Sequence, residues 1–206
     1  MGDVNQLVYL KRFIPSVSGP IIEIGSKDYG STSSFRDFYA GCEYVGIDME
    51  PGKNVDLVVD LTKGIGELRT SHFALGICCS VLEHVRRPWL LAEHLTSVIR
   101  AGGALYMSVP WVWRYHAYPD DYFRFSWRGI MELFPSFEWT NVCYSTNVPN
   151  EFFDIVANNP GIDNSLASFA ETPAGKRKYL PYLMVNMLGV KSALGARAFL
   201  HSSASP

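Results

Sequence analysis

The chain has 206 residues, of which 48% are hydrophobic and 18% are charged, and its formal net charge is −2. This length suits one domain with a substantial core, so we predict a single domain over residues 1–206. The charge balance gives no general attraction to nucleic acid, and no nucleic-acid partner is expected. Because the sequence has no run of about 18 apolar residues, no membrane-spanning helix is expected.

The cysteines indicate the compartment. The four of them, Cys42, Cys78, Cys79 and Cys143, show no C-x-x-C spacing, and the adjacent pair lies in an apolar run. This pattern is typical of small buried residues rather than of a disulfide framework. Residues 1–6 are polar and show no signal-peptide pattern, so we expect a cytoplasmic protein.

Short apolar segments alternate with helical patterns, which predicts an α/β fold with a doubly wound, mostly parallel sheet. Seven strands are expected, the last two as an antiparallel pair: residues 21–24, 44–47, 57–59, 73–79, 104–109, 137–145 and 152–157. Helices are expected over residues 4–14, 32–40, 88–99 and 127–134, and Ser126 is placed to cap the last of them.

The C-terminal part, residues 175–200, is predicted to be helical. Its apolar residues between Tyr179 and Leu188 fit one face of a helix, and the basic cluster Lys176–Lys178 precedes them. Such a helix packs on the sheet or against a second copy in a homodimer. Contact with a membrane surface is the alternative role.

The turn after the first strand, in PIIEIGSKDYG at residues 20–30, is where a ligand would meet backbone N–H groups. A phosphate-binding P-loop needs lysine where Ser31 stands, and a dinucleotide motif needs glycine where Lys27 stands. An adenosyl ligand without phosphates needs one close backbone approach and acidic residues for its amino and hydroxyl groups. Glu23 and Asp48 have that placement, and a turn without any ligand is the alternative.

Residues 111–126, WVWRYHAYPDDYFRFS, combine aromatic, charged and histidine side chains after the fifth strand. Irregular segments of this length are usually functional or disordered, and the aromatic content argues against disorder. We therefore expect this segment to line the substrate side of a cleft.

Five segments in order, EIG, YVGIDME, VVDL, CCSVLEHV and GGALYMSVPW, resemble the class I S-adenosylmethionine-dependent methyltransferases. The resemblance is greatest to the small-molecule branch with "LEHV" after the fourth strand, and it covers residues 20–135. It implies a Rossmann-like methyltransferase fold, with residues 20–135 as the cofactor-binding core and S-adenosyl-L-methionine as the cofactor. The cofactor-binding residues that it implies are Glu23, Gly25, Ser26, Asp48, Met49, Asp60, Leu61, Cys79 and Ser80.

The sequence departs from the family in the glycine motif, where Lys27 and Tyr29 replace the second and third glycines. Gly30 offers a late turn instead. Lys27 either pairs with the carboxylate of the cofactor or is a solvated loop residue. The departure leaves open a catalytically inactive, methyltransferase-like binding or partner module.

Methyl transfer to a hydroxyl needs positioning and a general base. His84 and His116, which follow the fourth and fifth strands, are the candidate catalytic residues, because imidazole titrates near neutral pH. Structural roles in their loops are the alternative. We expect O-methylation of a small hydroxyl-bearing acceptor. The candidate substrate-binding residues are Glu83, Trp111, Tyr115, Asp120, Asp121 and Arg124.

Three of these substrate candidates have simpler alternatives. The alternative for Arg124 is a salt bridge to one of the two aspartates. Separately, the alternative for the Asp120–Asp121 pair is a solvated turn. The spacing of the two histidines and two aspartates demands no metal, so no metal is expected.

Overall fold

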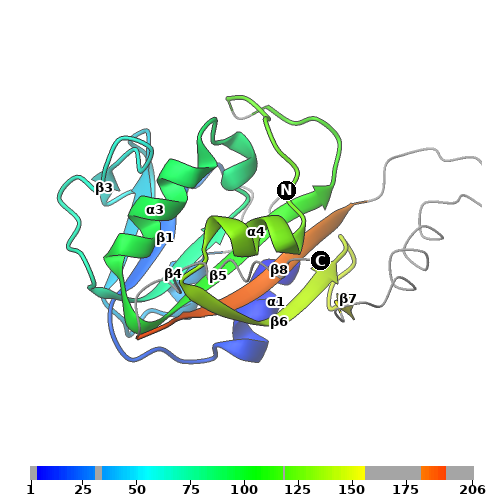
Figure 1. The fold of residues 1–206 in the computed structure, drawn as a ribbon, viewed down its shortest axis with the longest axis horizontal. Coiled ribbons are helices and arrows are strands. Elements are labelled where there is room, and N and C mark those ends of the chain that lie inside the picture. Colours follow the sequence, from blue (N-terminus) through cyan, green and yellow to red (C-terminus); the bar gives the residue numbers. More distant parts are fainter. Residues whose placement is uncertain (1–3, 31–33, 118, 156–181, 194–206) are drawn as a thin grey trace, which may run out of the picture.

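The computed structural model describes residues 4–30, 34–117, 119–155 and 182–193. They form an eight-stranded sheet in the order β3-β2-β1-β4-β5-β8-β6-β7 (Figure 1). The strands are β1 Ile21–Ile24, β2 Tyr44–Asp48, β3 Leu57–Val58, β4 Phe73–Cys79, β5 Ile99–Val112, β6 Phe137–Ser145, β7 Phe152–Asp154 and β8 Leu183–Lys191. The helices are α1 Val4–Phe13, α2 Phe35–Phe38, α3 Pro88–Val98 and α4 Trp127–Leu133, and a 3-10 turn, η1, spans Leu82–His84.

The parallel part of the sheet confirms the α/β prediction. Strands β3, β2, β1, β4 and β5 are neighbours in this order, and each pairs in parallel with the next. The expected antiparallel pair of β6 and β7 is also present. Parallel strands end at the same edge of the sheet, so the loops after β1, β2, β4 and β5 meet there.

Strand β8 corrects two predictions. The helix expected over residues 175–200 is wrong between Leu183 and Lys191, and the sheet has eight strands rather than seven. The strand lies between β5 and β6 and pairs antiparallel with both. Most of its residues are buried, whichever face of the sheet they point to. Polar and apolar residues therefore do not alternate in its sequence. The remainder of residues 175–200 lies outside the described residues.

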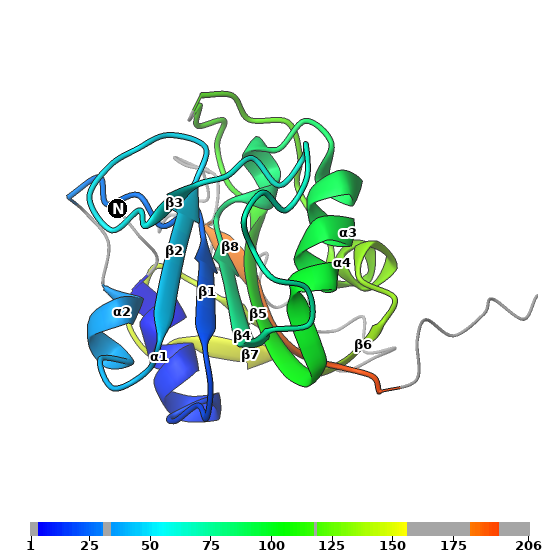
Figure 2. The same cartoon turned by 90° about the vertical axis from the view of Figure 1, so that its left-hand side faces the viewer.

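Helices cover both faces of the sheet. Figure 2 shows α1 and α2 on one side, and α3 and α4 on the other. Successive residues of β5 alternate between the two cores: Leu105 and Met107 pack on the α3 and α4 side, whereas Tyr106 packs with α1. The ring of Tyr106 stacks on that of Tyr9 with a centroid distance of 4.7 Å.

The helix ends follow the expected local signals. The hydroxyl of Ser126 accepts a hydrogen bond of 3.1 Å from the Gly129 N–H and caps α4, as predicted. Pro88 occupies the first turn of α3, where its missing N–H costs nothing. In the described part of the chain, no helix is both long enough and apolar enough to cross a bilayer.

Candidate active site

The turn after β1 requires glycine at position 25. Gly25 has a φ of +72°, and a Cβ placed on it would lie 2.6 Å from Cγ2 of Val81. The N–H groups of Gly25 and Ser26 both donate to the carbonyl of Ile47 in β2, over 2.9 and 3.0 Å. The hydroxyl of Ser26 is buried and donates to the carbonyl of Asn54. The backbone of this turn is therefore fixed against the neighbouring strand, while Gly25 itself is exposed.

Two ion pairs join the turn to the loop after β2. Lys27 pairs with Glu50 and Lys53 pairs with Asp28, each over 2.7 Å. The Asp28 N–H also donates to the Lys53 carbonyl over 3.0 Å. The side chain of Lys27, which replaces a family glycine, is thus paired within the protein and holds two loops together.

Asp48 is the last residue of β2 and is partly buried. It accepts hydrogen bonds from the N–H groups of Glu50, over 3.1 Å, and Lys27, over 3.4 Å. These bonds orient the carboxylate without using all its acceptor positions. Next to it, the Met49 side chain is 53% exposed. An exposed glycine turn, an oriented carboxylate and an exposed apolar side chain fit the methionyl part, the ribose and the base of an adenosyl ligand.

Glu23 and Leu61 are placed differently from these residues. The carboxylate of Glu23 accepts a hydrogen bond of 2.7 Å from the Tyr44 hydroxyl, and burial raises its pKa to about 7. The Leu61 side chain is 3% exposed and belongs to the core on the α3 side, while its carbonyl accepts a hydrogen bond from His94. Both side chains therefore have structural contacts of their own.

The other expected cofactor residues lie at strand ends. The carboxylate of Asp60 accepts hydrogen bonds from the N–H and hydroxyl of Thr62. Cys79 is partly buried at the end of β4. Ser80 follows with a φ of +55°, and its N–H donates to the carbonyl of Ser108 in β5.

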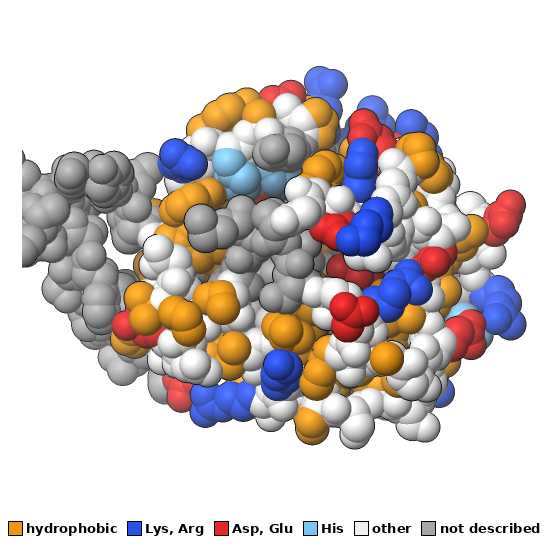
Figure 3. All heavy atoms as spheres, turned by 180° about the vertical axis from the view of Figure 1, so that it is seen from behind, with side chains coloured by type: hydrophobic (Ala, Val, Ile, Leu, Met, Phe, Trp, Pro, Cys, Tyr) orange, Lys and Arg blue, Asp and Glu red, His pale blue; other side chains and the backbone are white. Residues whose placement is uncertain are grey.

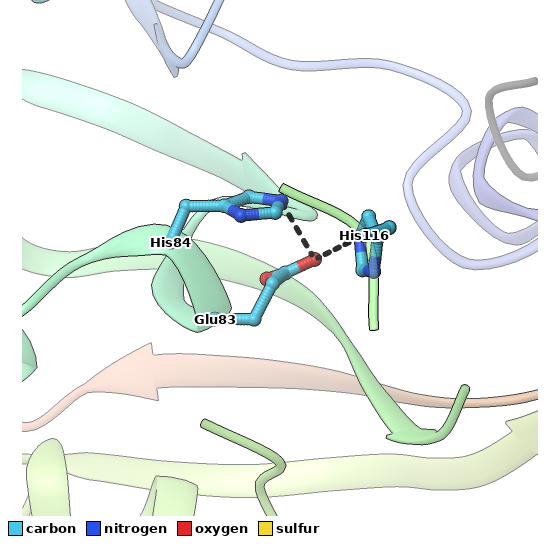
Figure 4. A group of neighbouring side chains, drawn as sticks. All are labelled: Glu83, His84 and His116. Carbon is cyan, nitrogen blue, oxygen red and sulfur yellow. Dashed lines mark ion pairs between the residues drawn. The ribbon is translucent and has the colours of Figure 1, made fainter. Parts of the chain in front are cut away.

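Three side chains converge beyond the ends of β4 and β5. Glu83 and His84 belong to η1, and His116 belongs to the segment after β5. Oε1 of Glu83 lies 3.8 Å from Nε2 of His84 and 3.9 Å from Nε2 of His116 (Figure 4). The two imidazole rings meet edge to face, with centroids 4.8 Å apart. We call these three residues the Glu–His–His cluster.

Backbone carbonyls determine which nitrogen of each ring carries a proton. Nδ1 of His84 lies 2.6 Å from the Asp120 carbonyl, and Nδ1 of His116 lies 3.2 Å from the Arg114 carbonyl. A carbonyl oxygen only accepts, so Nδ1 is the donor in each ring. In the neutral rings, Nε2 is then unprotonated and its lone pair faces Glu83.

Burial changes the acid–base properties of the cluster. The Glu83 side chain is only 1% exposed, and neither of its carboxylate oxygens has a hydrogen-bond partner in the described part of the chain. Burial raises its pKa to about 8. Burial also lowers the pKa of His116. The side chains of His84 and His116 remain 13% and 28% exposed, and Figure 3 shows histidine side chains reaching the surface among apolar ones.

An ion pair shapes the segment 111–126. The guanidinium of Arg124 binds both carboxylate oxygens of Asp121 and also donates to the carbonyls of Trp113 and Arg114. Asp121 in turn accepts a hydrogen bond of 2.8 Å from the His116 N–H. The ion pair proposed as the alternative for Arg124 is therefore present, and it positions His116.

The remaining expected substrate residues lie around the same cluster or beneath it. The Asp120 carboxylate accepts hydrogen bonds from the hydroxyls of Tyr115 and Tyr122. Tyr115 is 66% exposed, whereas Trp111 is partly buried against the core. The structure thus brings Glu83, His84, His116 and Asp120 together. Trp111 instead packs against the core.

Helix α1 contributes two buried polar residues that the sequence analysis missed. The side-chain amide of Gln6 donates to the hydroxyls of Ser80 and Ser108, each over 3.3 Å. Asn5, which is fully buried, binds the loop between β6 and β7. The sequence signal that could have revealed them is a pair of adjacent amide side chains near the start of an otherwise amphipathic helix.

No protein-family model matches the sequence, and no curated protein matches it. Solved structures do match. The Bacillus subtilis YcgJ protein shares 9% identity, with a TM-score of 0.60 over 91% of this chain and 98% of that one. A Burkholderia thailandensis 1,6-didemethyltoxoflavin-N1-methyltransferase with bound S-adenosylhomocysteine shares 12%, with a TM-score of 0.57 over 91% and 76%.

Phosphoethanolamine N-methyltransferase 2 of Haemonchus contortus, solved with S-adenosyl-L-methionine, shares 13% identity, with a TM-score of 0.56. The match covers 91% of this chain and 52% of that enzyme, so the chain spans about half the enzyme's length. At these identities the similarity concerns the fold. The chain has the Rossmann-like fold of class I S-adenosylmethionine-dependent methyltransferases.

Proposed function

We propose that the protein is an S-adenosylmethionine-dependent methyltransferase of small molecules with a hydroxyl-bearing acceptor. The observation that carries the proposal is the Glu–His–His cluster, which lies beyond the ends of β4 and β5. Ligands of open α/β sheets bind outside the carboxyl ends of the strands. We also propose that the protein is cytoplasmic.

The residues around the first two strand ends would hold the cofactor. Gly25 allows a close backbone approach, the Asp48 carboxylate accepts hydrogen bonds from ribose hydroxyls, and Met49 packs against the base. When bound, S-adenosylmethionine supplies a methyl group on a positively charged sulfur. Structures related in fold that are described with this cofactor or its demethylated product support this part of the proposal.

The acid–base cluster favours a hydroxyl acceptor. A hydroxyl must lose its proton as its oxygen attacks, whereas a neutral amine can attack before it loses one. Nε2 of His84 and Nε2 of His116 are unprotonated in the neutral rings, and both side chains are partly exposed, so either imidazole can take that proton. The ion pair of Arg124 and Asp121 holds the His116 loop during this step.

Calorimetric titration of the full chain with S-adenosylmethionine, S-adenosylhomocysteine and NAD tests the cofactor. We expect micromolar binding of the two adenosyl ligands and no binding of NAD. A folded protein that binds neither adenosyl ligand would overturn the proposal and favour the binding or partner module. In that case the ion pairs of Lys27 and Lys53, which close the loops beside Asp48, are the structural cause to examine.

The acceptor side is tested separately with His84→Ala and His116→Ala. We expect each change to lower turnover more than it lowers cofactor affinity. If both variants keep full turnover, neither imidazole takes part in the reaction.

A further inference from the structure

The Glu–His–His cluster presents three lone pairs to one point. Nδ1 of each imidazole is engaged by a backbone carbonyl, so the atoms that face Glu83 are the two unprotonated Nε2 nitrogens. They lie 3.8 and 3.9 Å from Oε1 of Glu83, which is too far for a hydrogen bond. The Glu83 carboxylate, fully buried, has no hydrogen-bond donor in the described part of the chain. A positive group between these atoms would satisfy all three.

We propose that Glu83, His84 and His116 bind a divalent transition-metal ion of the zinc class, through Oε1 of Glu83 and Nε2 of the two histidines. The three ligand atoms lie within 4.8 Å of one another. Bonds of about 2.0–2.2 Å to zinc place tetrahedral ligand atoms about 3.3–3.6 Å apart. The separations of 3.8 and 3.9 Å from Oε1 exceed that spacing by a few tenths of an ångström, so side-chain rotations draw the three atoms together around the ion.

The donor set selects the kind of cation. Magnesium and calcium prefer oxygen ligands, whereas imidazole suits zinc, iron, nickel and copper. Two imidazoles and one carboxylate leave one or more positions open on the ion, as in catalytic zinc sites. The partial exposure of both histidine side chains gives the ion and an added ligand a path from solvent.

The surroundings of the ligands match those of metal sites. Ligating histidines usually donate their other N–H to a carbonyl or carboxylate, which fixes the ring and increases its basicity. Here the carbonyls of Asp120 and Arg114 accept these bonds, and Oδ2 of Asp121 lies 3.3 Å from Nδ1 of His116. The nearby positive charge of Arg124 is paired with Asp121. A cation that binds here therefore replaces the proton of the Glu83 carboxyl, and the carboxylate charge balances the cation.

The catalytic use of the ion rests on the proposed function. An acceptor hydroxyl that coordinates the open position has a lowered pKa and loses its proton to water. Its oxygen then forms the bond to the methyl carbon as the bond from carbon to sulfur breaks. The two imidazoles act as ligands in this arrangement, and the cation replaces them in activating the hydroxyl.

Metal binding is measured directly, without any methyl acceptor. The full chain, without a polyhistidine tag and treated with a chelator, is titrated calorimetrically with Zn²⁺ and, separately, with Mg²⁺. We expect one equivalent of Zn²⁺ to bind with micromolar or tighter affinity and Mg²⁺ not to bind. Cobalt(II) titration should produce the visible absorption bands of a low-coordinate site with nitrogen and oxygen ligands.

Variants assign the site. Glu83→Gln, His84→Ala and His116→Ala should each weaken Zn²⁺ binding by at least about 10-fold. His72→Ala is the matched control, because His72 lies at the opposite end of β4 beside Glu43. Circular dichroism checks that each variant is folded. The nearly isosteric Glu83→Gln change keeps the test decisive if a histidine variant does not fold.

Failure to bind Zn²⁺ or Co²⁺, or equal binding by the wild type and Glu83→Gln, would overturn the metal site. Titration with S-adenosylmethionine in the presence of EDTA separates this result from the proposed function. Binding of the cofactor without any metal binding leaves the methyltransferase proposal standing alone. If the protein binds Zn²⁺ but not S-adenosylmethionine, the metal site is retained and the methyltransferase proposal is overturned.

Discussion

The side-chain amide of Asn5 donates to the carbonyl of Thr146, 141 positions later in the chain, over 2.8 Å. The same amide donates to the Val148 carbonyl over 2.9 Å, and its oxygen accepts from the Asn150 N–H over 2.8 Å. One buried side chain of α1 thus satisfies three backbone groups of the loop between β6 and β7. This contact ties the first helix to a loop at the same edge of the sheet as the candidate site.

Asn5→Ala should lower the free energy of unfolding by about 1–3 kcal/mol, because it leaves the carbonyl of the buried Thr146 without this hydrogen-bond donor. Urea denaturation measures the change. Arg12→Ala, an exposed change on the same helix, is the control and should cost less than about 1 kcal/mol. Equal costs for the two variants would contradict the role given to Asn5.

Gly25→Ala should destabilise the protein by roughly 1–3 kcal/mol, since the new Cβ meets Val81 and the φ is positive. Gly30→Ala isolates the conformational part, because Gly30 has a φ of +80° and nothing within 4 Å of an added Cβ. It should cost less. The double variant Gly25→Ala/Val81→Ala should be less destabilised than the sum of the two single changes, and simple additivity would rule out the steric explanation.

Glu23 should make stability depend on pH. Burial raises its pKa from an ordinary value of 4.5 to about 7, so folding favours the protonated form. Its contribution is complete below pH 4.5, declines as the pH rises toward 7, and is lost above that, by up to about 3 kcal/mol. Chemical denaturation at several pH values should show this decline in the wild type and a flatter profile for Glu23→Gln. Identical profiles would show that Glu23 does not titrate this way.

Asp48→Asn should weaken S-adenosylmethionine binding about 10-fold or more, because a charged acceptor of hydrogen bonds is replaced by an amide. Calorimetric titration gives the affinity directly. Glu67→Gln removes one negative charge at an exposed position and serves as the control. If Asp48→Asn bound the cofactor with unchanged affinity, Asp48 would not be the residue that binds the ribose.

Arg124→Lys should loosen the segment 111–126. A lysine cannot bind both oxygens of Asp121 while also donating to the carbonyls of Trp113 and Arg114. Limited proteolysis should therefore cut this segment faster in the variant. Arg128→Lys, an exposed change on α4, should leave the cleavage rate unchanged. Equal rates for all three proteins would show that the ion pair does not hold the loop.

The parallel half of the fold could be predicted because its strands and helices follow local rules. The helix cap at Ser126 and the run of buried residues in β4 are examples. Strand β8 could not be predicted, since a continuous apolar run suits a buried strand or a buried helix equally. Its choice depends on partners elsewhere: Asn186 is buried and accepts a hydrogen bond from Tyr106, and it donates to Ser145.

The site shows the same division. The positions of Gly25 and Asp48 follow from the strand ends, whereas the burial of Glu83 depends on the segment 111–126 folding over it. The N–H of Tyr122 donates to the Glu83 carbonyl over 2.7 Å, a contact between residues 39 positions apart that no local pattern encodes. The polar partners of Asn5 are similarly distant in the chain.

The position of β8 has a consequence for synthesis on the ribosome. Among the described strands β8 is synthesised last, and it lies between β5 and β6, so β6 has no partner on that side until β8 has been made. A nascent chain that ends before Leu183 exposes the long edges of β5 and β6, which are open to pairing with other chains. The sheet is completed only after residue 191 has left the ribosome.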